Sequence, residues 1–101
     1  MSAAKSKKDL VRMAWITELR RQGHRQCVGT TSSRGHVCAL MLLWELAGRP
    51  PFSIVAAATE LAGLSNWQAG RVMMMNDGLR SIRRHTFAEI ADVVASWFPT
   101  N

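Results

Sequence analysis

Apolar side chains recur every three or four positions along most of the chain, the spacing at which residues share one face of an α-helix. In residues 10–21, Arg12 and the other arginines fall mostly off the apolar stripe formed by Val11, Trp15, Ile16 and Leu19. Residues 36–47 are apolar on nearly every side, which predicts a buried central helix. Residues 24–35 show no period and indicate a loop, or one weak hairpin around Gly29.

Three further helices are predicted in the second half of the chain. Residues 52–61 form the first, and Gly63 ends it in the left-handed conformation. Its expected inner face consists of Ile54, Val55, Ala58, Leu61 and Ala62. Capping boxes, Ser65 with Gln68 and Thr86 with Glu89, open the last two helices. The pattern predicts an all-α, single compact domain of about five short helices at residues 10–99, after a basic flexible tail at residues 1–9.

Composition narrows the class of protein. The chain has 101 residues, of which 48% are hydrophobic and 20% charged, enough for one domain with a modest core. The longest apolar run, residues 37–44, is too short to span a bilayer. The basic start is followed by Asp9 and Arg12 instead of an apolar block, so we expect no secretory signal and a cytoplasmic protein without membrane partners.

The formal net charge of +6 is concentrated in residues 1–34, which hold eight Lys or Arg and two Asp or Glu. The rest of the chain is close to neutral, apart from one basic cluster at residues 80–85. Such asymmetry can steer a protein toward phosphate backbones or an acidic protein face, or it can serve solubility alone. The candidate partner-binding residues are the arginines of these segments: Arg20, Arg21, Arg25, Arg80, Arg83 and Arg84.

Zinc-binding residue types occur at four of fifteen positions, at His24, Cys27, His36 and Cys38. A His-x-Cys spacing at a helix start points its two side chains apart, and Cys38 begins an apolar stretch typical of core packing. Cys27 follows Arg25 in a loop, where the cation would lower the pKa of the thiol. We predict no metal, no cofactor and no catalytic residue, and whether these four side chains converge stays open.

Residues 58–72 are similar to a helix-turn-helix motif, with a Gly turn, a Leu-Ser pair and a second helix. That second helix would present Asn66, Trp67, Gln68 and Arg71 to a DNA major groove, and Trp67 is the tryptophan we expect to be exposed. Two features weaken this interpretation: Thr59 stands where a small residue usually allows a tight crossing, and the second helix carries one basic residue.

Several short motifs follow one another in order. They are residues 15–20 (Trp-Ile-Thr-Glu-Leu-Arg), Gln26 with Gly29, residues 46–48 (Leu-Ala-Gly), Asn76 with Asp77, and residues 86–94 (Thr-Phe-Ala-Glu-Ile-Ala-Asp-Val-Val). This order resembles a family of small proteins common in bacteriophage and actinobacterial genomes, over residues 13–97. The family's apolar helix often carries two or three cysteines, and here it has Cys38 alone. The resemblance implies a compact helical domain and a phage or mobile-element setting, but no activity.

These observations favour a non-catalytic phage or mobile-element protein that binds a macromolecular partner stoichiometrically in the host bacterial cytoplasm. A protein or nucleoprotein partner is preferred, such as a host-defence complex inhibited in the manner of anti-CRISPR proteins. A nucleic acid partner and the oligomeric state stay open. The alternative is a helix-turn-helix DNA-binding regulator, and the third hypothesis is a zinc- or thiol-dependent enzyme.

Overall fold

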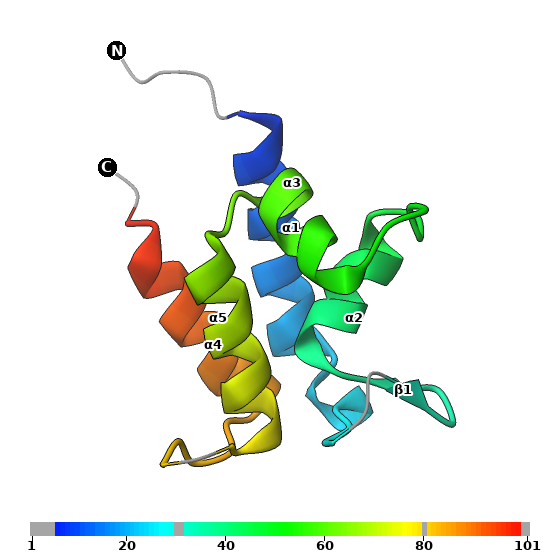
Figure 1. Cartoon of the computed structure of the whole chain (residues 1–101), viewed down its shortest axis with the longest axis vertical. Coiled ribbons are helices and arrows are strands. Elements are labelled where there is room, and N and C mark those ends of the chain that lie inside the picture. Colours follow the sequence, from blue (N-terminus) through cyan, green and yellow to red (C-terminus); the bar gives the residue numbers. More distant parts are fainter. Residues whose placement is uncertain (1–5, 30–31, 80, 100–101) are drawn as a thin grey trace.

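A computed structural model describes residues 6–29, 32–79 and 81–99. Five α-helices account for most of the described residues: α1 (Lys7–Arg21), α2 (Ala39–Leu46), α3 (Ile54–Ala62), α4 (Asn66–Asp77) and α5 (Phe87–Trp97) (Figure 1). A 3-10 helix, η1 (Gly23–Arg25), and a hairpin of β1 (Ser32–Ser33) and β2 (His36–Val37) lie between α1 and α2. The predicted all-α fold is therefore confirmed.

Hydroxyl caps set the starts of four of the described helices, and three of these caps are capping boxes. The predicted capping boxes of α4 and α5 are present: Ser65 Oγ accepts from the Gln68 backbone N–H at 3.0 Å, and Thr86 Oγ1 accepts from the Glu89 N–H at 3.2 Å. An unpredicted box, Ser6 with Asp9, starts α1 three residues earlier than expected. Because this box fixes the first turn, residues 7–9 are helical and not part of a tail.

The segment before α2 differs from the prediction. His36 and Val37 pair with β1, so the central helix begins only after Cys38, whose Sγ accepts from the Met41 N–H at 3.4 Å. The hairpin turns at Arg34 and Gly35, between the paired residues 33 and 36, and not at Gly29. Val37 and Cys38 are buried in the structure. A buried strand and a buried helix both take hydrophobic residues, so hydrophobicity alone did not exclude a helix.

Helix α3 starts two residues later than predicted, because Ser53 caps it by accepting from the Ala56 N–H at 3.1 Å. In this helix Ala57, Ala58 and Ala62 are buried and Val55 is exposed. The expected position of Val55 on the inner face was therefore wrong. Gly63 ends the helix in the predicted left-handed conformation, with φ 75°.

Helix α1 packs against α2, α3 and α5. Trp15 and Leu19 are fully buried, and the Trp15 indole Nε1–H donates to the Ala39 carbonyl at 2.9 Å, which joins α1 to the start of α2. Helix α5 runs antiparallel beside α1 (Figure 1) and buries Phe87, Ile90 and Val94. The antiparallel arrangement brings the end of α1 next to the first half of α5.

Arg12 was expected to lie off the apolar stripe, but it is buried, with 8% of its surface exposed. Its Nη1 donates to the Ala62 carbonyl at 2.9 Å, its Nη2 pairs with Asp9, and its guanidinium stacks on the Phe98 ring at 3.7 Å. The last carbonyls of a helix lack intrahelical partners. Arg12 donates to one of these carbonyls at the end of α3, and this hydrogen bond accounts for its burial.

Candidate functional site

The two basic segments predicted from the sequence are tied together in the structure. Gln26, just after η1, donates from Nε2 to the His85 carbonyl at 2.7 Å and accepts on Oε1 from the Phe87 N–H at 3.1 Å. Residues 22–29 and 81–86 therefore meet at the lower end of the molecule in Figure 1. Arg20 and Arg21 close α1 there, and Arg83 and Arg84 precede α5.

Asn76, at 1% exposure, supports this junction from inside. Its Oδ1 accepts from Gln26 Nε2 at 3.1 Å and from the Ala39 N–H at 3.2 Å, while its Nδ2 donates to the Cys27 carbonyl at 2.9 Å and to Asp77. Asn76 was predicted only as part of a short motif with Asp77, without a role in the site. The available signal was a polar residue directly after a run of three methionines, at a helical position that faces the core.

We use the name basic end for the four arginines that close α1 and precede α5: Arg20, Arg21, Arg83 and Arg84. Arg83 Nη2 lies 2.6 Å from Glu89 Oε2, and Arg20 Nη2 lies 3.0 Å from Asp92 Oδ1. Glu89 and Asp92 are three residues apart on α5 and share a face, so this face of α5 pairs with Arg20 of α1 and with Arg83 of the segment before α5.

Arg21 completes the pairing on α1, where its Nη2 lies 2.8 Å from Glu18 Oε2. Arg84 is exposed and has no ion pair or side-chain hydrogen bond within the described residues. Of the two remaining candidates, Arg25 points away from the basic end toward the hairpin and α2, since it donates to the Gly35 carbonyl. Arg80 lies outside the described residues.

Two carboxylates at the basic end, Glu18 and Glu89, are held in the charged state. The hydrogen bonds from Arg83, followed by the Thr86 backbone N–H, lower the pKa of Glu89 to about 2. The hydrogen bonds from Arg21 lower the pKa of Glu18 in the same way. At neutral pH the basic end is therefore a set of fixed, alternating charges, and Arg84 is its unpaired cation among the described residues.

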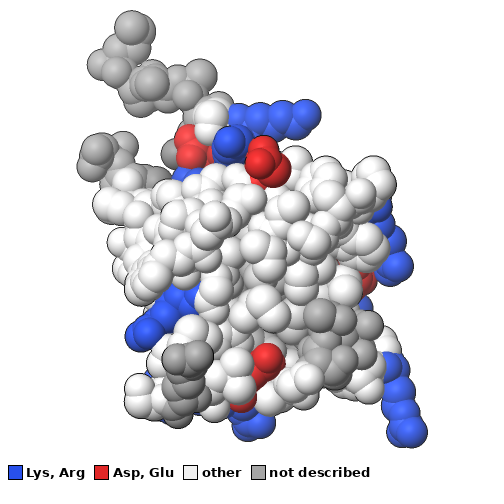
Figure 2. Space-filling view, viewed as in Figure 1, with Lys and Arg blue, Asp and Glu red and all other residues white. Residues whose placement is uncertain are grey.

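The residues of the DNA-binding alternative lie at the start of α4. Trp67 is 66% exposed, as predicted, with its ring centroid 5.9 Å from that of Trp97 and 6.0 Å from the Arg71 guanidinium. Asn66 is exposed as well, but the Gln68 side chain is occupied, because its Oε1 accepts from the Ser65 N–H at 2.8 Å. Figure 2 shows that the face over α3 and α4 carries little charge.

The cysteines and histidines do not form a reactive or metal-binding group in the described residues. Burial raises the pKa of both Cys27 and Cys38, so the expected lowering of the Cys27 pKa by Arg25 was wrong. Cys27 lies beside β2, where its N–H donates to the Val37 carbonyl at 3.0 Å, and both His24 and His36 are exposed. No group of three or more His, Cys, Asp or Glu within the described ranges can hold a metal ion.

A cavity of about 400 Å³ lies between the hairpin, η1, α2 and the segment after α2. Three arginines line it, Arg25, Arg34 and Arg49, with Glu45 as the one carboxylate. Arg34 and Arg49 were not among the site residues predicted from the sequence. The available signal was their position beside Gly35 and Gly48, where an arginine stands in a turn that usually takes Asn or Gly.

Comparison with known proteins gives no match, whether with a protein-family model, a curated protein or a solved structure. In the described part of the chain, no helix has the length and apolar character needed to cross a membrane.

Proposed function

We propose that this protein is a non-catalytic binding protein of the phage or mobile-element type, which binds a macromolecular partner through the basic end. The observation that carries the proposal is that Arg20, at the end of α1, and Arg83, before α5, pair with carboxylates on one face of α5, although the two arginines are about sixty residues apart in sequence. Partly buried hydrogen bonds of Gln26 with His85 and Phe87 hold these segments together before binding, which lowers the entropic cost of binding.

The arginines of the basic end can exchange their present carboxylate partners for carboxylates of a binding partner. Exposed ion pairs contribute little to stability because solvent screens them, so the loss of Arg83–Glu89 or Arg20–Asp92 costs the fold little. A partner's carboxylates can replace Glu89 and Asp92, and Arg84 can make a first contact without breaking a pair. This chemistry favours an acidic protein surface, and the protein component of a host-defence nucleoprotein complex is the partner we propose.

Purification of the tagged protein from its bacterial host tests this proposal. We expect one host nucleoprotein complex at a fixed ratio, with reduced cleavage of its nucleic acid target. The double variant Arg83→Glu with Arg84→Glu should lose that complex. Lys7→Glu with Lys8→Glu is the matched control, because it makes the same charge change in the first turn of α1.

Arg83→Glu places a carboxylate beside Glu89 and can disturb the local fold, so Arg84→Glu alone is the second variant, with circular dichroism to check folding. A stoichiometric complex that survives both variants unchanged contradicts the basic end as the contact surface.

The second candidate, a DNA-binding regulator, is favoured by the connection between α3 and α4. Three residues, Gly63 to Ser65, separate the helices, as in helix-turn-helix motifs, and Trp67 and Arg71 lie at the start of α4. The weakly charged face over these helices offers few phosphate contacts, so we place this function second. A duplex mobility shift at low salt that Arg71→Gln abolishes and Arg84→Gln does not would favour it over the basic end.

A further inference from the structure

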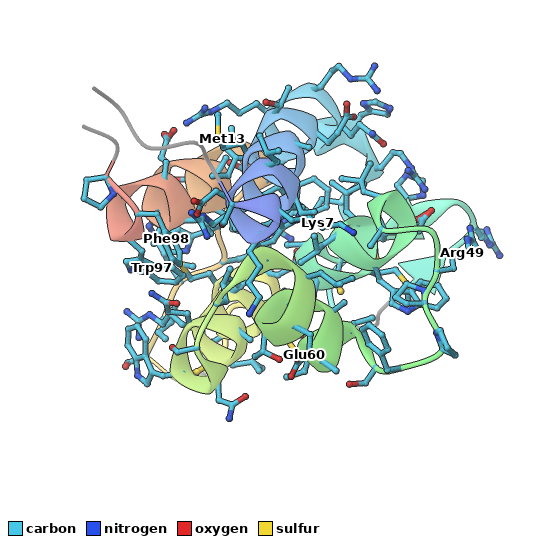
Figure 3. The ribbon with its side chains drawn as sticks, turned by 90° about the horizontal axis from the view of Figure 1, so that it is seen from above. Lys7, Met13, Arg49, Glu60, Trp97 and Phe98 are labelled. Atoms are coloured by element: carbon cyan, nitrogen blue, oxygen red, sulfur yellow. The ribbon has the colours of Figure 1, made fainter. Side chains whose placement is uncertain are left out.

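The cavity beside the hairpin has an excess of positive charge. Arg25, Arg34 and Arg49 face one carboxylate, Glu45, so the formal charge of its lining is +2 with His36 neutral. Its volume, about 400 Å³, lies within the range of small-molecule sites. Figure 3 places Arg49 on the side of the molecule opposite Trp97 and Phe98, so this site is separate from the aromatic cluster of α4 and α5.

Arg25 and Glu45 form the part of the cavity lining that is held by hydrogen bonds within the protein. Arg25 donates from Nε to the Gly35 carbonyl at 2.9 Å, from Nη1 to Gln22 at 2.9 Å and from Nη2 to Glu45 at 3.3 Å. The carboxylate of Glu45 also lies 3.5 Å from Arg49 Nη2. Glu45 therefore pairs with the guanidinium groups of both Arg25 and Arg49. The Arg25 and Glu45 side chains are both less than one third exposed.

Arg34 and Arg49 are the exposed members of the site. Arg34 makes no side-chain hydrogen bond within the described residues, and Arg49 makes a long one to Glu45 while its guanidinium lies 5.7 Å from the Trp44 ring centroid. Trp44 is held in place because its Nε1–H donates to the Pro50 and Phe52 carbonyls, both at 3.0 Å. Most donors of the two exposed guanidinium groups are thus available to a ligand.

The backbone supplies an independent observation. Among the described residues, two that are not glycine have positive φ, Arg34 at 50° and Arg49 at 55°, and both line this cavity. Arg34 and Gly35 form a two-residue hairpin loop with positive φ at both positions, where Asn-Gly is the preferred pair. Arginine has no local advantage at either position, and strained residues of this kind concentrate at binding sites.

We propose that this cavity binds the phosphoryl group of a small molecule, with Arg34 and Arg49 closing over a phosphate that Arg25 faces from below. Guanidinium forks match phosphate oxygens in bidentate geometry. The lining charge of +2 balances a phosphate monoester, which carries about −1.5 to −2 at neutral pH. A ligand with a single carboxylate would carry a charge of only −1 and would leave the lining with a net positive charge. The site goes beyond the proposed function, because neither Arg34 nor Arg49 belongs to the basic end.

Titration of the ¹⁵N-labelled full chain, followed by amide and indole NMR shifts, tests the proposal. The probes are inorganic phosphate and adenosine 5′-monophosphate, with adenosine as the phosphate-free control. We expect saturable shifts at Gly35, His36 and the Trp44 indole with the phosphate-bearing probes. Binding of both probes assigns recognition to the phosphoryl group alone, and binding of the nucleotide alone adds a contribution from its base and sugar.

Arg34→Asn and Arg49→Asn are the decisive variants, because each removes a guanidinium and puts a residue that tolerates positive φ in its place. Each should weaken binding at least about tenfold, the effect of one charge-assisted hydrogen bond. Arg84→Asn, an exposed arginine outside the cavity, should leave the affinity unchanged. Melting curves will show whether each variant is folded.

The proposal is overturned if neither phosphate-bearing probe binds saturably, if adenosine binds equally well, or if both cavity variants keep the native affinity. Cavity shifts produced only by a DNA duplex or by an acidic peptide would also overturn it and assign the site to a macromolecule. Because the test of the basic end uses Arg83 and Arg84, failure of one proposal is distinguishable from failure of the other.

Discussion

Arg12 is the one charged side chain in the described residues that the core buries, and it joins three helices. Arg12→Met keeps most of the side-chain volume but removes the hydrogen bond to Ala62 and the stacking on Phe98. We expect a loss of about 2 kcal/mol in unfolding free energy, since a carbonyl loses its charged donor. Urea unfolding followed by tryptophan fluorescence measures the loss.

The matched control is Arg20→Met on the same helix, whose side chain is exposed, with an expected effect of less than about 0.5 kcal/mol. Equal midpoints for the Arg12 variant and the native chain would mean that Arg12 does not hold α3 and α5 to α1.

Glu89 gives the pH prediction at the residue scale. Its pKa in the folded protein is about 2, below the ordinary value of 4.5. The ionised carboxylate therefore favours the folded state above pH 4.5, and this contribution is lost as the pH falls from 4.5 to about 2. Carboxyl ¹³C shifts measure the titration directly. Arg83→Gln should raise the pKa toward 4.5, and an unshifted titration in that variant would contradict the ion pair.

Local residue roles could be predicted from the sequence, and distant ones could not. Ser65, Thr86 and their glutamine and glutamate partners lie three residues apart, so the capping boxes are visible in any short window. Arg12 meets Ala62 fifty positions away, and Gln26 meets His85 fifty-nine positions away. No periodicity in the chain encodes such contacts, because they depend on how whole helices pack.

At the scale of elements, the hairpin is where sequence pattern and structure differ most. Residues 36–37 read as the start of an apolar helix, but Val37 forms a bridge with Gln26, and Cys27 donates to the Val37 carbonyl. The hairpin partner of Val37 is Ser32, only five residues away, but residues 24–35 show no period that would predict a strand. The same hairpin brings Arg34 to the cavity, so the missed element and the missed site residue have one cause.

The hairpin turn predicts a stabilising substitution. Arg34→Asn should raise the unfolding free energy by about 0.5–1 kcal/mol, because Asn adopts positive φ at lower cost than Arg. Calorimetry on both proteins measures the change, and Arg84→Asn, whose φ is not positive, should show no gain. A lower melting temperature for Arg34→Asn would assign the guanidinium a structural role and remove the backbone argument for a ligand site.

At the scale of the whole molecule, Asn76 connects η1, α2, α4 and the approach to α5. Asn76→Ala removes four hydrogen bonds and leaves the Ala39 N–H and the Cys27 carbonyl without that partner. We expect a loss of about 3 kcal/mol in unfolding free energy, and faster amide exchange at Phe87 as the loop contact loosens. Asn66→Ala, an exposed asparagine at the start of α4, is the control and should change neither quantity. Unchanged exchange at Phe87 in Asn76→Ala would contradict the proposed support of the basic end.

The distribution of charge over the whole molecule separates the two binding modes by their dependence on salt. When the basic end meets an acidic protein face, Arg20 and Arg83 exchange one carboxylate for another, so the number of ion pairs changes little. We therefore expect affinity to fall by less than about tenfold between 50 and 200 mM salt. A protein that makes six to ten phosphate contacts loses about 10³–10⁵ over the same range. Affinity for the purified partner, measured across that series by calorimetry, decides between them. A steep loss would mean that phosphate groups and not carboxylates contact the arginines, and it would turn the basic end from a protein-binding surface into one that binds nucleic acid.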